Sequence, residues 1–131
     1  MKIALGVGGG IAAYKSPELP RTLQDRGCAI DVIMTEAARQ FIQPLTFAAL
    51  TGHKVITGLW AGGQTSGDDV LSSSVEHIRV AQENEILLVA PATADLIAKF
   101  AHGLADDFLS TLYLAFAGRV VLAPAMNTNM W

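Results

Sequence analysis

The sequence contains little charge and a single cysteine. Charged residues make up 16% of the chain and the formal net charge is −3, so nothing in the overall charge attracts nucleic acid. Cys28 has no second cysteine to pair with, which excludes an internal disulfide and a multi-cysteine metal site. We expect Cys28 to be a small buried side chain just before a strand. The three histidines are dispersed and lack an accompanying carboxylate cluster, so we predict no metal site.

Long hydrophobic runs are missing too. No stretch approaches the roughly 18–20 apolar residues of a membrane span, and residues 1–13 lack the features of a secretory signal peptide. We therefore expect a cytoplasmic protein without a membrane partner. The chain has 131 residues, enough for one domain with a core. Its hydrophobic fraction of 51% is high for so few charges, which indicates strands buried on both faces, surface reserved for other subunits, or both.

Four short, unbroken apolar runs predict the strands. They lie at residues 3–7, 30–34, 86–90 and 120–123. Continuous β-branched runs of this length are typical of strands covered on both faces. Helix-like stretches separate them, which implies right-handed crossovers and a parallel sheet. We predict an α/β fold, a Rossmann-like three-layer α/β/α sandwich with a mostly parallel sheet.

The intervening stretches predict the helices. Residues 11–15 form a short opening turn, after which Ser16 is expected to cap a helix with Pro17 at its first position and Gly27 past its end. A second helical region spans about residues 36–50, with an interruption at 43–44, and residues 54–56 form a weak strand. Two further helices are expected at 94–100 and 107–116. Residues 57–76, rich in glycine and serine, predict a long mobile loop, a type of segment that often serves as a lid.

Four polar or glycine-rich segments each follow a predicted strand. They are residues 8–10, 35–37, 91–95 and 124–127. The carboxyl ends of parallel strands lie along one edge of a sheet, and ligands bind in the crevice there. The four segments together predict a ligand site at this edge more strongly than any one of them does alone.

The first of these segments matches a loose dinucleotide fingerprint, Gly8-x-Gly10-x-x-Ala13. Its glycines let backbone amides approach a phosphate, and the helix that follows adds partial positive charge. A tight strand–helix turn is the alternative interpretation. Glu36 stands where a dinucleotide enzyme holds a ribose, so an NAD(P)-binding domain stays open. No lysine follows the glycines in the P-loop pattern, which argues against a nucleotide triphosphatase.

Several other side chains could bind a ligand or serve local structure. Thr35 and Thr93 offer hydroxyls at strand ends, for a ligand or for turn capping. Asp95 is first interpreted as a helix cap, with a ligand or subunit contact as the alternatives. Met126, Met130 and Trp131 are expected to form apolar walls, subunit contacts or plain core packing.

Two residues could carry chemistry. His77 lies between the predicted loop and a buried element, where an imidazole can exchange a proton near neutral pH. Its alternative is a surface or structural role. Asn127 cannot act as a base, but its amide can orient a carboxylate or amide. His53 and His102 are expected to be exposed or to cap helices.

These segments resemble the homo-oligomeric flavin-containing cysteine decarboxylases. Residues 9–15 are similar to the family's amino-terminal turn, residues 76–78 to the element with its active-site histidine, and residues 91–96 to its flavin-contact segment. Residues 103–107 continue the similarity. Residues 124–131 match the family's Pro-x-Met-Asn-x-x-Met-Trp signature. The resemblance covers essentially the whole chain.

The resemblance implies FMN-dependent decarboxylation of phosphopantothenoylcysteine to phosphopantetheine in coenzyme A biosynthesis, by a carboxy-lyase that oxidises the cysteine thiol. His77 would assist the oxidation, Asn127 would hold the leaving carboxylate, and Met130 would also contact the substrate. FMN would lie near a subunit interface of a homo-oligomer built from trimers. The residues expected to line FMN are Gly9, Gly10, Ile11, Thr35, Ala37, Thr93, Ala94, Asp95 and Ala125.

The sequence also departs from the family. Gly8 and Gly10 stand where the family often has serine or threonine, and several relatives have asparagine in place of Asp95. The family's reductive step uses a cysteine in a flap after the signature, and Cys28 matches no such position. We therefore expect residues 1–131 to be the FMN-binding domain of a longer protein, with a phosphopantothenate–cysteine ligase as the expected fusion. A peptidyl-cysteine decarboxylase and a non-catalytic flavin-binding subunit are the alternatives.

Overall fold

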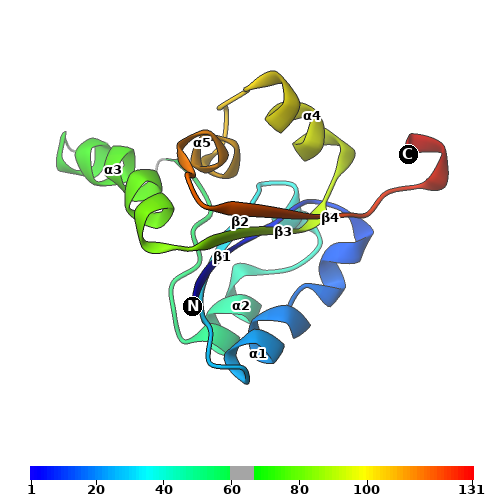
Figure 1. Cartoon of the computed structure of the whole chain (residues 1–131), viewed down its shortest axis with the longest axis horizontal. Coiled ribbons are helices and arrows are strands. Elements are labelled where there is room, and N and C mark those ends of the chain that lie inside the picture. Colours follow the sequence, from blue (N-terminus) through cyan, green and yellow to red (C-terminus); the bar gives the residue numbers. More distant parts are fainter. Residues whose placement is uncertain (60–66) are drawn as a thin grey trace.

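The core of the fold is a four-stranded parallel sheet. In a computed structural model, which describes residues 1–59 and 67–131, the strands are β1 (Lys2–Val7), β2 (Ala29–Met34), β3 (Ile86–Ala92) and β4 (Arg119–Pro124), in the order β2-β1-β3-β4 (Figure 1). All four predicted strands are confirmed. The α/β fold class is confirmed with them, and β4 forms a largely exposed outer edge.

Helices cover both faces of this sheet. The 3-10 helix η1 (Ile11–Lys15), α1 (Glu18–Gln24) and α2 (Pro44–Thr51) lie on one face, and α4 (Ala94–His102) and α5 (Phe108–Ala115) on the other (Figure 1). Successive β1 side chains point to opposite sides: Leu5 packs into the core cluster under α1 and α2, and Ala4 into the cluster under α4 and α5. Burial on both sides explains why the strands read as unbroken apolar runs.

Close packing fixes α5 on the sheet. A Cβ atom at Gly6 of β1 would lie 2.7 Å from Leu109 Cδ1, so Leu109 occupies the space that any other residue would need. Leu109 itself is buried. The absence of a side chain at Gly6 therefore lets α5 approach the centre of the sheet.

The helix ends follow the sequence except at α1. Gly52 and Gly103 adopt left-handed φ values of 73° and 67° at the ends of α2 and α4, a conformation that favours glycine. The second helical region is interrupted as predicted, into η2 (Ala38–Gln40) and α2. The prediction that Ser16 caps the first helix is wrong. Pro17 occupies the cap position, and the Ser16 hydroxyl donates a hydrogen bond to the Ala90 carbonyl, 2.9 Å away, in the core.

The prediction of a loop at residues 57–76 is wrong for the part of this segment that is helical. α3 (Gly67–Glu83) contains the second half of that segment, while residues 60–66 lie outside the described part of the chain. Arg79 forms ion pairs with Glu76 at 2.7 Å and Glu83 at 2.8 Å, both at helical spacing. Val80 is fully buried against the sheet. Along residues 75–83, buried Val80 and the ion pairs of Arg79 hold the helix, while Val75 and Ile78 are exposed, so this part of the sequence shows no broad hydrophobic stripe.

Two smaller expectations are corrected in part. Residues 54–56 form no strand, and only Ile56 makes a parallel bridge to Ile33 of β2. Cys28 packs against the first core cluster but is half-buried rather than buried. None of the described helices combines the length and the apolar character needed to cross a membrane.

Candidate functional site

The strand order of the sheet reverses next to β1. From β1 the chain continues to β2 on one side, and then crosses to β3 and β4 on the other side. A crevice forms where parallel connections diverge in this way, and ligands of open α/β sheets bind there. The four polar and glycine-rich segments predicted from the sequence all leave strands at this edge.

The glycine loop after β1 lies between the ends of β2 and β3. A Cβ atom at Gly8 would come within 2.5 Å of the Pro91 carbonyl oxygen, to which the Gly8 amide donates a hydrogen bond of 3.1 Å. A Cβ atom at Gly9 would collide with Ala37. Gly8 and Gly9 are therefore required by close contacts with neighbouring segments, and the structure brings three of the four strand-end segments together.

Gly10 differs from its two neighbours. Its backbone is extended, and an added Cβ would meet only Thr93 Cγ2, at an ordinary contact distance of 3.6 Å. Gly10 precedes η1, whose first turn has no side-chain cap, and Ile11 next to it is exposed. Packing within the protein thus does not require a glycine here. The free space and the uncapped amides fit the close approach of an anionic group to the backbone.

Thr35 and Thr93 both serve as local caps. The Thr35 hydroxyl accepts a hydrogen bond from the Ala38 amide at 3.1 Å and donates to the Val7 carbonyl at 3.4 Å. Thr93 caps α4 by accepting from the Leu96 amide at 3.2 Å. The capping interpretation is confirmed for both. The hydrogen-bonding capacity that remains for a ligand lies mainly with Thr93, because only its hydroxyl hydrogen is left unassigned.

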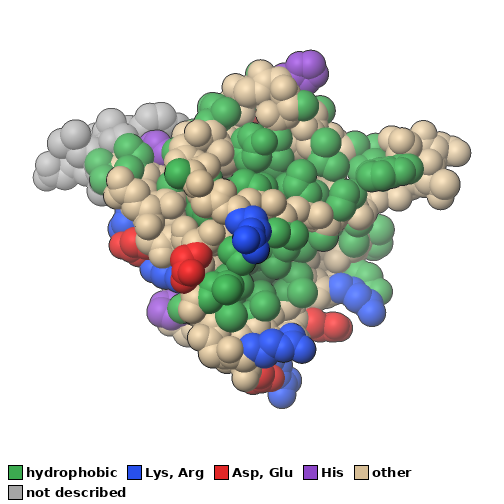
Figure 2. All heavy atoms as spheres, viewed as in Figure 1, with side chains coloured by type: hydrophobic (Ala, Val, Ile, Leu, Met, Phe, Trp, Pro, Cys, Tyr) green, Lys and Arg blue, Asp and Glu red, His purple; other side chains and the backbone are tan. Residues whose placement is uncertain are grey.

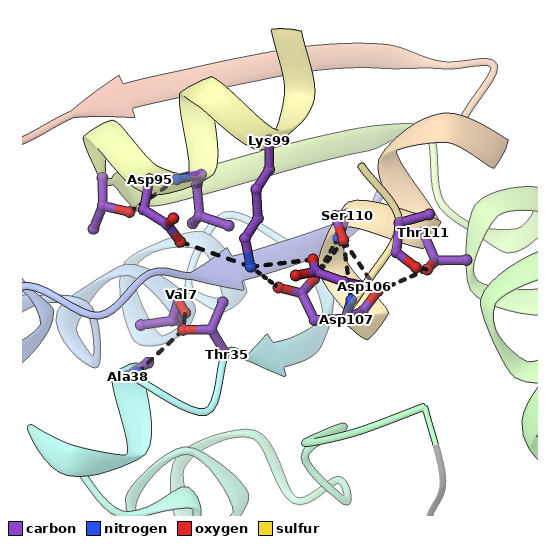
Figure 3. A network of polar contacts seen from close by, with 12 residues as sticks. Val7, Thr35, Ala38, Asp95, Lys99, Asp106, Asp107, Ser110 and Thr111 are labelled. Atoms are coloured by element: carbon purple, nitrogen blue, oxygen red, sulfur yellow. Dashed lines mark hydrogen bonds and ion pairs between the residues drawn. The ribbon is translucent and has the colours of Figure 1, made fainter. Parts of the chain in front are cut away.

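Asp95 does not cap α4, so that first interpretation is wrong. Thr93 fills the cap position, and Asp95 lies in the first turn, where its exposed carboxylate is 3.7 Å from Lys99 Nζ. Lys99 also reaches Asp106 at 3.1 Å and Asp107 at 3.2 Å, so three carboxylates surround one ammonium (Figure 3). Burial alone lowers the pKa of Lys99, but hydrogen bonds to Asp106 and Asp107 outweigh it and raise the pKa above its ordinary value.

Asp107 links this ion cluster to α5. Its carboxylate accepts from the Ser110 amide at 2.7 Å, and its own amide donates to the Ser110 hydroxyl oxygen at 3.2 Å, which forms a capping box. The Ser110 hydroxyl also donates to the carboxylate at 2.8 Å. Burial raises the pKa of Asp107, but the bonds from Ser110 and Lys99 exceed that effect and hold the pKa below its ordinary value. Asp107 is therefore an ionised cap that receives donors from two helices.

A cavity of about 200 Å³ opens beside these residues. Its lining includes Thr35 and Glu36 after β2, Asp106 before α5, and Phe108 and Leu109 within it. A larger cavity of about 630 Å³ includes Lys2 and Ala29, the first residues of β1 and β2, in its lining. We assign the smaller cavity to the candidate site because it alone of the two contains residues from the carboxyl edge.

His77 lies on α3, in contact with the first residue of α5. Its ring packs edge-on against Phe108, with ring centres 6.5 Å apart and planes at 81°. Nδ1 of His77 is buried and has no hydrogen-bond partner among the described residues. An unpartnered buried nitrogen is costly and uncommon, and it identifies an imidazole whose orientation is set by packing. His53 and His102 are exposed, as predicted.

Asn127 lies in the segment after β4. Its Oδ1 atom accepts a hydrogen bond from the Asn129 amide at 2.9 Å and caps η3 (Thr128–Met130). The side-chain NH2 group is left to donate, as binding to a carboxylate requires. Met130 and Trp131 are 62% and 83% exposed, so core packing is excluded for both. Ala125 joins this segment to the edge, because its amide donates to the Ala92 carbonyl at 3.1 Å.

The structure does not bring His77 and Asn127 together. Their segments, α3 and residues 125–131, lie at opposite ends of the molecule in Figure 1. The strand-end residues Gly9, Gly10, Ala37, Thr93 and Ala125 do gather at one edge.

Sequence reasoning missed the residues that support this edge, namely Ser16, Lys99, Asp107 and Phe108. One signal was present: Asp107 and Ser110 have the spacing of a capping box.

Comparisons with known proteins agree with this geometry. The family model described as "Flavoprotein" matches residues 1–131. The coenzyme A biosynthesis bifunctional protein CoaBC of Vibrio cholerae serotype O1 is 47% identical over 130 residues, covering 99% of this chain and 31% of that protein. The chain thus spans about a third of the length of the curated relatives it matches.

Solved structures show the same fold. The FMN-dependent cysteine decarboxylase SpaF matches with a TM-score of 0.85 and 32% identity, covering 100% of this chain and 71% of that one. The C175S mutant of a PPC decarboxylase, complexed with pantothenoylaminoethenethiol, matches with a TM-score of 0.77 and 26% identity, over 99% and 69% of the two chains. The match along the whole chain and the similarity to SpaF show that this chain belongs to the Flavoprotein family.

Proposed function

We propose that this chain is the FMN-binding part of a phosphopantothenoylcysteine decarboxylase, a carboxy-lyase of coenzyme A biosynthesis. The observation that carries the proposal is the gathering of the four strand-end segments, the open glycine loop among them, at one edge of the sheet, in a chain that belongs to the Flavoprotein family. The similarity to a bifunctional protein of coenzyme A biosynthesis and to a PPC decarboxylase supports the choice of substrate.

The residues at the carboxyl edge fit FMN. The backbone amides of Gly9 and Ile11 are available to the phosphate, while the Gly10 amide donates to the Gly8 carbonyl at 3.2 Å and Gly10 keeps the space beside them free of a side chain. The remaining contacts come from neighbouring strand ends, where the lining residues are Thr35, Ala37, Thr93, Ala94, Asp95 and Ala125. Bound FMN would supply the two-electron acceptor for oxidation of the substrate's cysteine thiol.

His77 and Asn127 have different roles in the reaction. The imidazole of His77 takes up a proton during thiol oxidation, because an imidazole can exchange protons near neutral pH and this ring is only half-buried. The Asn127 amide donates to the substrate carboxylate and orients it for departure as CO2. Met130 is exposed three residues after Asn127, with its amide bonded to the Asn127 carbonyl, and provides an apolar contact to the substrate.

A complete site takes these two residues from different copies of the chain. α3 and the segment after β4 lie at opposite ends of one molecule, so neighbouring copies in a ring, as in a trimer, would bring His77 of one copy toward Asn127 of the next (Figure 1). Hydrophobic side chains gather across the face that carries β4 (Figure 2), where Leu114, Val121 and Leu122 are exposed. An apolar patch of this kind is typical of a surface that contacts another subunit or further chain.

The natural protein would also contain the ligase that makes its substrate and a flap with the cysteine for the reductive step. The bifunctional relatives, of which this chain covers about a third, support this organisation.

A substrate comparison tests the proposal. The natural full-length protein, loaded with FMN, is incubated with phosphopantothenoylcysteine or with a peptide ending in cysteine, and CO2 release is measured. Release from the phosphopantothenoyl substrate alone is the expected result. Release from the peptide alone would make the protein a peptidyl-cysteine decarboxylase, like the first alternative above. FMN binding without CO2 from either substrate would leave a non-catalytic flavin-binding subunit, and NAD(P) binding without FMN uptake would overturn the proposal entirely.

A further inference from the structure

Lys99 is more enclosed than a surface ion pair requires. Its side chain is 19% exposed, although the carboxylates of Asp95 and Asp106 around it are 76% and 62% exposed. The third partner, Asp107, is 27% exposed and lies 3.2 Å from Nζ. Holding a long lysine chain in one place costs side-chain entropy, which exposed ion pairs rarely repay. An ammonium bound by three carboxylates in a partly buried position therefore indicates a positional role.

The position that Lys99 determines is the start of α5. Its ammonium fixes one carboxylate oxygen of Asp107, while the other oxygen accepts the Ser110 amide and hydroxyl (Figure 3). The Thr111 hydroxyl donates to the Asp107 carbonyl at 2.7 Å, which ties a second side chain of the first turn to Asp107. Across the turn at Gly103, the ion pairs of Lys99 with Asp106 and Asp107 join α4 to the start of α5, and the stacked rings of Phe100 and Tyr113 join the two helices further along.

Phe108, the first residue of α5, transmits this position to His77. Phe108 is 3% exposed, and its ring meets the imidazole edge-on. One turn further along each helix, Val80 of α3 and Leu112 of α5 belong to the same buried cluster. The His77 ring is held by this contact instead of by a hydrogen bond, since its buried Nδ1 has no partner among the described residues.

We propose that Lys99 is a positioning residue for His77, acting through Asp107 and the ring of Phe108. Lys99 sets the carboxylate of Asp107, Asp107 sets the first turn of α5, and Phe108 sets the plane of the imidazole. None of the three exchanges a proton with the substrate. The proposal rests on the function proposed above for His77, but the geometry it describes is testable without turnover.

Histidine-selective NMR provides that test, because the chain contains only three histidines. The natural FMN-loaded protein is labelled with 15N-histidine, and the His77 signal is assigned by its loss in the His77→Asn variant. Lys99→Met removes the ammonium and retains a similar length, Lys99→Arg retains the charge, and Lys54→Met is the matched control at an exposed lysine. Phe108→Leu removes the ring but leaves the ion cluster intact, and it decides the question if Lys99→Met fails to fold.

The expected result is a shifted or broadened His77 signal in Lys99→Met and Phe108→Leu. The His53 signal stays in place, and Lys99→Arg largely restores the His77 signal. The turnover number falls roughly tenfold to a hundredfold while KM stays within about twofold, because a misdirected imidazole slows the chemistry without weakening binding. An unchanged His77 signal in a folded Lys99→Met overturns the proposal, whatever happens to activity, and so does an unchanged signal in Phe108→Leu. If the signal moves but the wild-type protein decarboxylates neither substrate, the function fails while the positioning contact stands.

Discussion

Replacing Gly9 or Gly10 by alanine separates packing from ligand approach at the glycine loop. A Cβ atom at Gly9 would lie 2.6 Å from the Ala37 carbonyl carbon and 2.8 Å from the Ala38 nitrogen, and backbone atoms cannot rotate away. Forcing a methyl group into such a site costs about 1–3 kcal/mol of folding free energy. At Gly10, the nearest atom would be a methyl group 3.6 Å away, and the extended backbone accepts any residue.

For Gly10→Ala, two small effects oppose each other in the apo protein. Alanine reduces the conformational entropy of the unfolded chain by about 0.4–1 kcal/mol, and it is a poorer N-cap than glycine by a similar amount. The unfolding free energy of the apo protein should therefore change by less than about 1 kcal/mol. FMN affinity should fall at least about tenfold, equivalent to roughly 1.4 kcal/mol, because the methyl group occupies the space left for the phosphate.

Equilibrium urea unfolding of the apo protein and fluorescence titration with FMN measure the two quantities independently. Gly9→Ala should lower both stability and FMN affinity, and Gly10→Ala should lower FMN affinity alone. Normal FMN binding by Gly10→Ala would contradict the predicted approach of the phosphate to Gly10, since it would mean that no ligand comes close to the backbone at this residue.

Three further variants test other parts of the structure. Asp107→Asn should cost about 1 kcal/mol, because asparagine can still cap α5 but loses the charge that pairs with Lys99. Because the folded-state pKa of Asp107 lies below its ordinary value, its stabilisation is complete above about pH 4 and is lost as pH falls through the folded pKa, so urea midpoints of variant and wild type should converge in acid. Ser16→Ala should lower the unfolding free energy by about 1–3 kcal/mol, measured in the same way, because it leaves the buried Ala90 carbonyl without its hydroxyl donor; an unchanged midpoint would contradict this. His77→Asn should retain FMN and the urea midpoint while abolishing substrate oxidation, and loss of flavin would instead make the histidine structural.

The sheet and its functional edge could be predicted because each rests on a local pattern. Strands buried on both faces need continuous apolar residues, so Leu5 and its neighbours identified β1 directly. The ligand edge followed from the rule that parallel strands end together. By contrast, α3 was missed: among its residues 75–83, whose side chains the structure describes, Val80 is buried while Val75 and Ile78 are exposed, and the ion pairs of Arg79 supply part of the support.

The support around the site depends on contacts that no local pattern contains. Lys99 meets Asp106 and Asp107 because the chain reverses at Gly103, a three-dimensional relation between two helices. Ser16 was predicted to cap a helix because serine commonly does so, yet its hydroxyl donates to the Ala90 carbonyl of β3 instead. Single residues with several possible partners are decided by tertiary packing, and sequence preference cannot rank those partners.

The most direct test of the central claim follows the substrate's carboxyl carbon. The natural protein, loaded with FMN, is mixed with phosphopantothenoylcysteine that is isotopically labelled in the cysteine carboxyl group, and labelled CO2 is measured beside a His77→Asn control. If the protein decarboxylates this substrate with the help of His77, labelled CO2 is expected from the wild-type protein and none from the control. Absence of labelled CO2 from a wild-type protein that has bound both FMN and the substrate would contradict it.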